Sequence, residues 1–358
     1  MMLLRVGVLA LGAVLSSGAF AQFSTGNLAV VLVGDGTTAL GATGAKTQIV
    51  EIDRATGLLT SKAWDLTFNA STRQNGIVLT GNSVSEGGLN SYNGKAVLGG
   101  YSAAVGTGSL GNLATKRALQ VDYGTGGITF SDFIAGGNIR SVATSDGSTY
   151  FAAMSTAGVM KGVTGNLTPT FVSGTDTNIR FTQVGPGVEV FYSINGSGGG
   201  FMKTTNTGNA ASWSTAANTI GIADFAFSSD GLNLYLAADA GTTPGAGVYR
   251  LSRTSTSSAF TGAATRISDV ATRYLTLYET GTSTSVYATR RPTNVTSTLV
   301  ALDGADTATT VISPSWSFTT SANQVVMGVD LVQVVPEPAT LAVLGLGLGV
   351  LTRRRKSR

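Results

Sequence analysis

The sequence predicts an all-β protein whose body is a single β-propeller. Short apolar runs alternate with glycine-rich turn signals along most of the chain. A module of several strands recurs with a period of about 40–50 residues, which is the range of propeller blades. No segment between the two ends has a persuasive helical period. Repeats of this kind cannot bury both faces alone, so they must stack around an axis.

The composition suits such a fold. Glycine accounts for 48 of 358 residues, about twice its ordinary usage, and only 12% of the residues are charged. Aliphatic and aromatic residues recur at strand spacing, so disorder is not expected. The chain has no cysteine and no histidine. This excludes disulfides, Ser-His-Asp triads, cysteine nucleophiles, histidine metal sites and thiolate zinc sites.

The first strands follow a pattern of strand, turn and strand. Leu28–Val33 is an apolar run that ends at a Gly-Asp-Gly turn, and Thr47–Asp53 alternates like a half-buried strand. A short strand is predicted at Trp64–Phe68. Further strands are predicted at 77–79, 96–101, 117–123 and 128–133, with a loop at Ser85–Gly88.

Two copies of the repeating module are clear. Each has a strand, a Ser-Asp-Gly turn, a tyrosine-containing strand that ends in Ala-Ala, a loop, and a strand that begins with Gly-Val. The copies span 139–161 and 222–251, and weaker copies span 179–203 and 272–302. The last strand, at 325–332, has no partner downstream, while the first strands lack an inner neighbour. Pairing them would close the ring, with six blades favoured and seven as the alternative.

Two glycine-rich stretches imitate nucleotide-binding motifs. Gly106-Thr-Gly-Ser-Leu-Gly111 matches G-x-G-x-x-G, with Asp132 at roughly the required distance, but the expected context is antiparallel strand rather than a βαβ unit. Gly41–Thr47 has the wrong spacing for a P-loop. Both stretches are interpreted as plain loops, and no cofactor site is predicted.

Acidic residues give no clear catalytic or metal site. Asp146 and Asp230 could bind calcium, but their Ser-Asp-Gly context indicates tight turns. Glycoside hydrolysis would need a carboxylate pair. Two pairs are candidates, although exposed charges are the plainer interpretation: Asp303 with Asp306, and Glu51 with Asp53. Three tryptophans could stack on sugars, although core packing is the commoner role: Trp64, Trp213 and Trp316.

The N-terminus has the pattern of a secretory signal peptide. Arg5 supplies the positive charge, and Val6–Leu15 is an apolar stretch of ten residues. Ala19 and Ala21 occupy the small-residue positions of the cleavage site, so residues 1–21 are predicted to be removed before Gln22. An uncleaved N-terminal anchor is the alternative.

The C-terminus has three parts in a fixed order. Pro336, Glu337 and Pro338 form an extended breaker, because proline removes a backbone donor and restricts the preceding residue. The apolar run Ala339–Leu351 follows, and as a helix it is shorter than the ~20 residues that usually span a bilayer. A basic cluster closes the chain and should stay on the cytoplasmic side, which places the body on the far side. It includes Arg353, Arg354 and Arg355.

This order resembles the PEP-CTERM sorting signal of Gram-negative bacteria, over residues 335–356. The resemblance implies transient insertion in the inner membrane, processing by an exosortase near Pro336–Pro338, and release to the cell surface or the exopolysaccharide matrix. The same C-terminal motif accompanies some ice-binding proteins, which implies no ice binding here. The body resembles glycine-rich propellers that precede such tails, through the phrases Ser85-Glu86-Gly87 and Asn138-Ile139-Arg140-Ser141.

The charge balance excludes one class of partner. The sequence pI of 9.3 reflects the terminal segments. Six of the 23 basic residues lie there, so the body itself is slightly acidic and no nucleic-acid partner is expected. The expected organisation is a signal peptide at 1–21, a propeller at 22–334 and a sorting signal at 335–358. The expected function is a non-enzymatic structural or binding module associated with exopolysaccharide. The alternative is a carbohydrate-active enzyme with a carboxylate site in the propeller channel.

Overall fold

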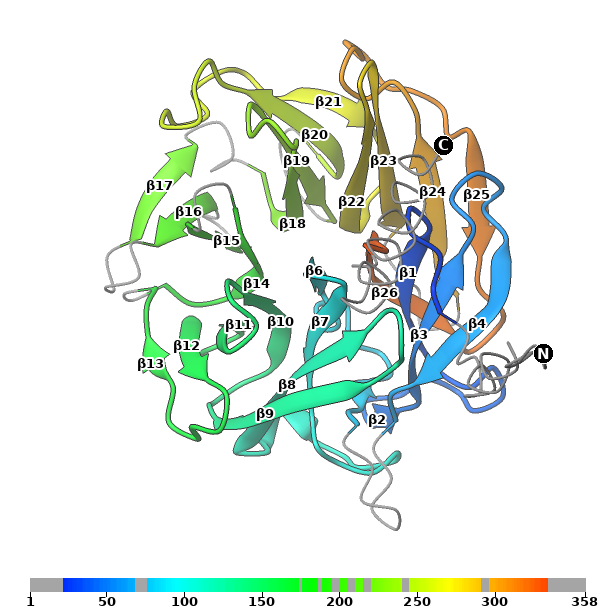
Figure 1. Cartoon of the computed structure of the whole chain (residues 1–358), viewed down its shortest axis with the longest axis vertical. Helices are drawn as coiled ribbons and strands as arrows, with labels where there is room; N and C mark the ends of the chain where they lie inside the picture. The colour runs from blue at the N-terminus through cyan, green and yellow to red at the C-terminus, as the bar shows by residue number, and fades with distance from the viewer. Residues whose placement is uncertain are drawn as a thin grey trace, which may run out of the picture.

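The computed structural model shows six four-stranded antiparallel sheets arranged around a central axis (Figure 1). It describes residues 22–67, 76–173, 176–185, 189–194, 200–204, 220–239, 245–290 and 296–333, together with the backbone of 210–214. We number the six sheets as blades 1 to 6 in the order of the chain. This is the all-β propeller that the repeats predict, with the favoured number of blades.

Each of blades 1 to 3 has its inner strand nearest the axis and its outer strand at the rim. Blade 1 comprises β26 (Val325–Leu331), β1 (Leu28–Val33), β3 (Thr47–Ile52) and β4 (Leu59–Asp65). Blade 2 comprises β6 (Leu89–Tyr92), β7 (Lys95–Gly100), β8 (Thr115–Asp122) and β9 (Ile128–Ile134). Blade 3 comprises β10 (Ile139–Thr144), β11 (Thr149–Met154), β12 (Val159–Val163) and β13 (Thr170–Phe171).

Blades 4 to 6 repeat this arrangement. Blade 4 comprises β14 (Ile179–Val184), β15 (Val190–Ile194), β16 (Gly200–Thr204) and β17 (Ala210–Ser214). Blade 5 comprises β18 (Ile222–Phe227), β19 (Asn233–Ala238), β20 (Gly247–Ser252) and β21 (Thr265–Ser268). Blade 6 comprises β22 (Thr272–Thr280), β23 (Ser283–Arg290), β24 (Thr298–Leu302) and β25 (Trp316–Thr319). A separate two-stranded sheet pairs β2 (Gly44–Ala45), which lies between β1 and β3 in sequence, with β5 (Leu79–Thr80), which lies between β4 and β6.

The two ends of the body close the ring. β26 pairs antiparallel with β1, from Leu28 opposite Leu331 to Val33 opposite Val325. Two backbone bonds extend the pairing, from Gly26 N to Val332 O at 3.0 Å and from Val332 N to Asn27 O at 2.9 Å. Blade 1 is therefore shared between the two ends, which confirms the predicted closure and leaves no open sheet edge at the join.

Five of the six inner strands carry a β-bulge near their start. At each bulge one residue has no partner on the neighbouring strand, so the register shifts by one. The bulged residues are Arg140 in β10, Arg180 in β14, Ala223 in β18, Arg273 in β22 and Met327 in β26. The repeat is thus conserved in backbone geometry around the ring, and three of its bulge positions are occupied by arginine.

Blade 2 departs from this pattern. Its inner strand β6 has no bulge and lies near the centre of the ring (Figure 1). The preceding residues pack against several blades. A Cβ added at Gly87 would lie 2.7 Å from Cβ of Met327, and one at Gly88 would lie 2.8 Å from Cβ of Ser141. Gly88 N also donates to Arg140 O at 2.9 Å. Residues 86–88, which we call the axial segment, therefore lie across the axis.

The core is distributed between neighbouring blades. Buried aliphatic and aromatic residues of blades 1, 2 and 6 form one large cluster. Phe23 belongs to it and stacks on Trp64 at a centroid distance of 4.0 Å. Around blades 4 and 5, the rings of Phe181 and Phe225 meet edge-on at 5.5 Å. Inter-blade packing of this kind supplies the stabilisation that disulfides would otherwise provide.

Helical structure is nearly absent from the described residues. They contain one short 3-10 helix, at Leu110–Asn112, which overlaps the end of the G-x-G-x-x-G stretch. No helix in this part of the chain has the length and apolar character needed to cross a bilayer. The predicted signal helix at 1–21 and the predicted membrane helix at 339–351 lie outside the described residues.

Some strand predictions were wrong in detail. The strand expected at Trp64–Phe68 is β4 and runs from Leu59 to Asp65. The loop prediction at Ser85–Gly88 missed that β6 follows at Leu89. β6 was missed because it is short and half polar. Outer strands such as β13 and β25 were missed because they are short and largely exposed, so they lack the apolar pattern that identifies a buried strand.

Candidate functional site

Glu86 of the axial segment joins several blades at the centre of the molecule. Its buried carboxylate accepts hydrogen bonds from Thr80 N at 2.9 Å, Tyr101 Oη at 3.0 Å and Asn138 Nδ2 at 2.8 Å. Its backbone oxygen accepts a bond from the hydroxyl of Tyr274. Burial raises the pKa of Glu86, and these donors partly oppose the rise. The side chain holds the segment in place rather than facing an open channel.

Three arginines surround this segment at one end of the axis. Arg140, Arg180 and Arg273 are each the second residue of an inner strand. The inner strands all run in the same direction because every blade repeats one antiparallel order. The three side chains therefore start from the same face. Arg140 and Arg273 are buried, whereas Arg180 is half-buried and closer to solvent.

The arginines affect one another electrostatically. Arg140 Nη1 donates to Asn178 Oδ1 at 2.8 Å and to Ile179 O at 2.9 Å. The pKa of Arg140 is lowered to about 10, mainly by burial; the charges of Arg180 and Arg273 contribute to the lowering, and Tyr274 and Glu86 oppose it. Arg273 forms an ion pair with Asp239. The result is a concentration of positive charge beside Glu86, which we call the arginine cluster (Arg140, Arg180 and Arg273).

Two carboxylates lie further along the inner strands. Asp224 Oδ2 accepts a hydrogen bond from Leu275 N at 2.9 Å, which joins blades 5 and 6. Asp330 Oδ1 accepts one from Thr276 Oγ1 at 2.8 Å, which joins blades 6 and 1. Burial raises the pKa of both groups, and the charge of Asp330 adds to the rise at Asp224. These residues are 106 positions apart, and no local sequence pattern predicts that Asp330 affects Asp224 electrostatically.

A cavity of about 270 Å³ lies between blades 2 and 3. Most of its polar lining is uncharged, with Lys95 as the one charged residue among those that line it. The polar lining residues are Lys95, Gln120, Thr129, Ser131, Thr144, Ser148, Tyr150 and Thr164. Burial raises the pKa of Tyr150 to about 12, so its hydroxyl is protonated and can donate a hydrogen bond at neutral pH. The ring of Phe130 adds an apolar surface.

The two glycine-rich stretches meet in space. Gly44 N donates to Thr107 O and Gly106 N donates to Gly44 O, each at 2.8 Å. Together they line a small cavity of about 90 Å³ that also contains Asp35. Because these amides already bond to each other, they are not directed at a phosphate group. The plain-loop interpretation was wrong at Gly44–Ala45, which forms β2, whereas the stretch from Gly106 is a loop that leads into the 3-10 helix at Leu110–Asn112.

The aspartates of the two Ser-Asp-Gly turns accept hydrogen bonds from residues of the same turns. Asp146 Oδ1 accepts bonds from Ser148 N at 2.8 Å and Thr149 N at 2.5 Å, and the backbone bond from Thr149 is the main cause that lowers its pKa to about 2. Asp230 Oδ1 accepts a bond from Leu232 N at 2.8 Å. Within the described residues, no three acidic side chains gather as they would around a metal ion.

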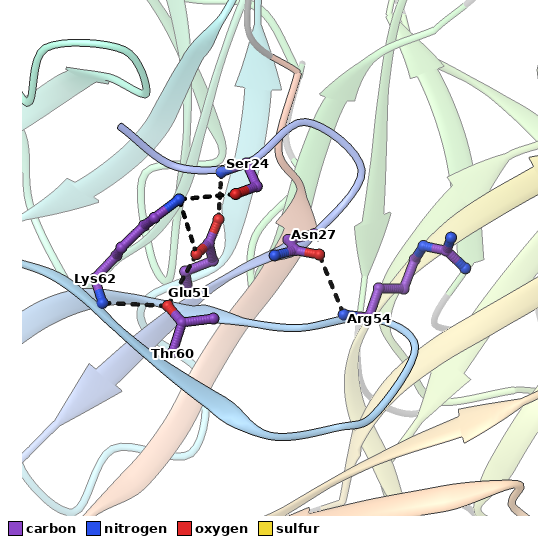
Figure 2. Close-up of polar contacts among 6 residues, drawn as sticks. All are labelled: Ser24, Asn27, Glu51, Arg54, Thr60 and Lys62. Carbon is purple, nitrogen blue, oxygen red and sulfur yellow. Dashed lines mark hydrogen bonds and ion pairs between the residues drawn. The ribbon is translucent and has the colours of Figure 1, made fainter. Parts of the chain in front are cut away.

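Glu51 corrects one expectation from the sequence. The plainer interpretation made it an exposed charge, but its side chain is fully buried. Figure 2 shows its carboxylate between Ser24 N, Thr60 Oγ1 at 2.8 Å and Lys62 Nζ at 3.5 Å. The same view shows Arg54 N near Asn27 Oδ1, at 3.4 Å. Glu51 therefore fixes the first residues of the body to blade 1 and does not form a catalytic pair with Asp53.

The other acidic pair and the tryptophans also have structural contacts. Asp303 accepts a bond from Ser285 Oγ at 2.5 Å, and Asp306 accepts one from Thr284 N at 3.0 Å. Trp316 Nε1 donates to Arg54 O at 3.0 Å, and its ring lies 5.7 Å from that of Tyr287. Trp64 stacks on Phe23. The side chain of Trp213 lies outside the described residues.

Comparison with protein families identifies the C-terminal segment. A family model described as the PEP-CTERM protein-sorting motif matches residues 334–356. The chain carries a PEP-CTERM sorting motif. Such a motif implies an exported protein that an exosortase sorts at the membrane. The match confirms the resemblance drawn from Pro336–Pro338 and from the basic residues Arg353–Arg355. No curated protein matches the sequence.

Comparison with solved structures finds distant similarities. Similar structures include the dihydro-haem d1 dehydrogenase NirN, a GH74 enzyme of Niastella koreensis and a candidate 6-phosphogluconolactonase of Bacteroides fragilis. Their identities to this chain are 10%, 16% and 12%, and the TM-scores are 0.42, 0.45 and 0.48. The matches cover 81%, 79% and 83% of this chain. They cover 53%, 45% and 83% of the other chains, so this chain spans about half the length of the first two.

The arginine cluster was not predicted from the sequence. The three residues lie 40 and 93 positions apart along the chain, so no local motif contains them. The available signal was the repeat itself, because aligning the modules puts an arginine second in three of the inner strands. The prediction of no catalytic, cofactor or metal site stays a prediction.

Proposed function

We propose that this chain is an exported surface or matrix protein of a Gram-negative bacterium, and that its propeller is a non-enzymatic module that binds exopolysaccharide. The N-terminal segment 1–21 would direct export, with cleavage between Ala21 and Gln22. Exosortase processing near Pro336–Pro338 at the inner membrane would then release the propeller. The sorting motif at 334–356 supports the route.

The cavity between blades 2 and 3 is the observation that carries the binding proposal. Its volume of about 270 Å³ is just below the usual size of small-molecule pockets. Its lining of hydroxyl, amide and aromatic groups suits a neutral sugar ring, which offers hydroxyls for hydrogen bonds and an apolar face for Phe130. Clustered carboxylates, which hydrolysis of a glycosidic bond needs, are not among the lining residues.

A glycan-binding screen of residues 22–334 tests this proposal. The closed ring lies within these residues, so all six blades are retained. We expect binding to one or more neutral polysaccharides, weakened at least tenfold by Tyr150→Phe. Tyr235→Phe is the matched control, because Tyr235 holds the equivalent position in the blade 5 repeat and its pKa is likewise raised to about 12 by burial. Unchanged binding by Tyr150→Phe would contradict a sugar site in this cavity.

The alternative is a carbohydrate-active enzyme, and Asp224 and Asp330 favour it. Burial raises the pKa of each, as an acid catalyst needs at neutral pH. Against it, both carboxylates accept hydrogen bonds from neighbouring inner strands, and the axial segment lies across the axis. Release of reducing sugars from exopolysaccharide by the wild-type body, abolished in Asp224→Asn, would support the enzyme and contradict the non-enzymatic proposal.

A further inference from the structure

We propose that the arginine cluster is a second binding site, which takes an oxyanion at the end of the axis where the inner strands begin. The site is separate from the cavity between blades 2 and 3, and it stands whether or not that cavity binds a sugar. Its ligand chemistry also differs, because the cavity is largely uncharged whereas this site is cationic.

The backbone brings the three guanidinium groups to one place. A bulge inserts one extra residue into a strand and re-aims its side chain. In β10, β14 and β22 this extra residue is Arg140, Arg180 or Arg273. Ala223 and Met327 occupy the same bulge in β18 and β26, so the geometry does not itself require arginine. Three of the five equivalent positions therefore carry an arginine that the bulge itself does not require.

Burying the charged side chains of the arginine cluster costs free energy unless an opposite charge lies nearby. Arg140 and Arg273 have exposed fractions of 8% and 1%, and like charges in such a poorly hydrated place repel one another. Two acidic groups offset part of the charge. Asp239 pairs with Arg273, and Glu86 is buried beside the cluster with four donors on its carboxylate. A bound anion would further stabilise a site in which three guanidinium groups lie close enough to affect one another.

Arg140 has a buried hydrogen-bond donor that remains unused among the described residues. Two hydrogen bonds, to Asn178 Oδ1 and Ile179 O, hold Arg140 through Nη1. Its Nε is buried and has no hydrogen-bond acceptor among the residues that the structure describes. A buried donor of this kind calls for an explanation, and a bound ion is one. Arg180, which is half-buried, gives the ligand access from solvent.

The planar guanidinium fork defines the ligand class. It donates two parallel hydrogen bonds to a carboxylate, phosphate or sulfate group. The ligand is therefore an oxyanion, either the carboxylate of an acidic sugar or a free inorganic oxyanion. Both sources share the chemistry that the arginines recognise.

Isothermal titration of the full-length chain in mild detergent tests this site. The probes are sodium glucuronate, sodium phosphate and sodium sulfate, each compared with sodium chloride at equal ionic strength. We expect saturable binding of at least one probe, weakened at least tenfold by Arg180→Gln. Binding of glucuronate alone would point to an acidic sugar, and binding of phosphate or sulfate alone would point to an inorganic oxyanion.

Two controls keep the result interpretable. Lys161→Gln removes one positive charge from β12, away from the inner strands, and should bind like the wild type. Arg180→Lys keeps the positive charge but lacks the planar guanidinium group, so it should weaken binding several-fold. This variant provides the test if Arg180→Gln does not fold. No saturable binding by the wild type, a response equal to that of chloride, or full binding by a folded Arg180 variant would each overturn the proposal.

Discussion

Glu86 accepts a hydrogen bond of 2.8 Å from Asn138 Nδ2, and this bond joins two segments that are 52 residues apart. Each residue belongs to one of the two phrases through which the body resembles other glycine-rich propellers. The bond fixes the axial segment against the start of β10, beside the arginine cluster. The two sequence segments, 85–87 and 138–141, therefore contact each other at the centre of the ring.

Loss of this bond should destabilise the body cooperatively. Glu86→Ala should lower the free energy of unfolding by about 1–3 kcal/mol or more, because Thr80, Tyr101 and Asn138 would lose a buried acceptor. Asn138→Ala should cost less. In a urea-unfolding double-mutant cycle on residues 22–334, we expect a coupling energy of about 0.5–3 kcal/mol between the two sites. Additive effects would show that the bond contributes nothing to stability.

Gly328 allows β26 to approach the axial segment. A Cβ at this position would lie 2.3 Å from Gly87 O and 2.9 Å from Leu89 Cβ. Gly328→Ala should therefore lower the free energy of unfolding by about 1–3 kcal/mol, as overpacking does. Gly281→Ala is the matched control, because its added Cβ would meet no atom within 4 Å. Equal urea midpoints for the two variants would contradict this close approach.

Phe23 should stabilise the body although it lies at the start of the predicted mature chain. Its side chain is 1% exposed and stacks on Trp64. Phe23→Ala should lower the free energy of unfolding by about 3–5 kcal/mol, as other buried phenylalanine truncations do. Phe171→Ala, at a side chain that is 43% exposed, should change it far less. Thermal unfolding followed by circular dichroism would measure both.

Stability should fall as the pH rises above about 4. Burial raises the pKa of Asp224 well above its ordinary value near 3.9, so the folded state binds a proton that the unfolded state releases. The contribution is complete below the unfolded pKa and is lost as the pH rises through the folded one. Hydrogen bonds lower the pKa of Asp146, which acts in the opposite direction below pH about 4.

Asp224→Asn should flatten this dependence. The slope of unfolding free energy against pH, measured by urea titration from pH 4 to 8, should be smaller in the variant than in the wild type. The slope is informative even if the variant is less stable overall. Asp269→Asn, at an exposed side chain, should leave the slope unchanged. A wild-type slope in Asp224→Asn would show that Asp224 does not carry the effect.

The sorting motif should be required for processing. Replacement of Pro336, Glu337 and Pro338 with alanine should leave unprocessed protein in the inner membrane, because the exosortase acts near this motif. Fractionation and immunoblotting of producing cells would measure the distribution. Alanine replacement of Gly281, on the body, is a suitable control. Normal surface release of the triple variant would refute the predicted route.

Much of the fold follows from local pattern. β1 has the bounds that the sequence predicts, and β14 and β18 begin at the residues where the predicted repeat copies begin. The count of six blades follows from the repeat and from the unpartnered strands at the two ends. Exposed outer strands and the short β6 escaped prediction, since periodicity reveals a strand only where one face is buried. Glu51 shows the same limit, because its burial depends on Ser24 and Lys62 rather than on its neighbours in sequence.

The sequence by itself determined the route of export and the architecture. Both depend on contiguous signals: the tail that begins at Pro336 and a repeat whose hydrophobic spacing requires blades to stack. Only the tertiary structure decided which polar residues meet. Closure of the ring brings Asp224 towards Asp330, places Glu86 across the axis, and gathers Arg140, Arg180 and Arg273 at one end. These pairings arise from bulges and long-range register, which a linear pattern does not encode.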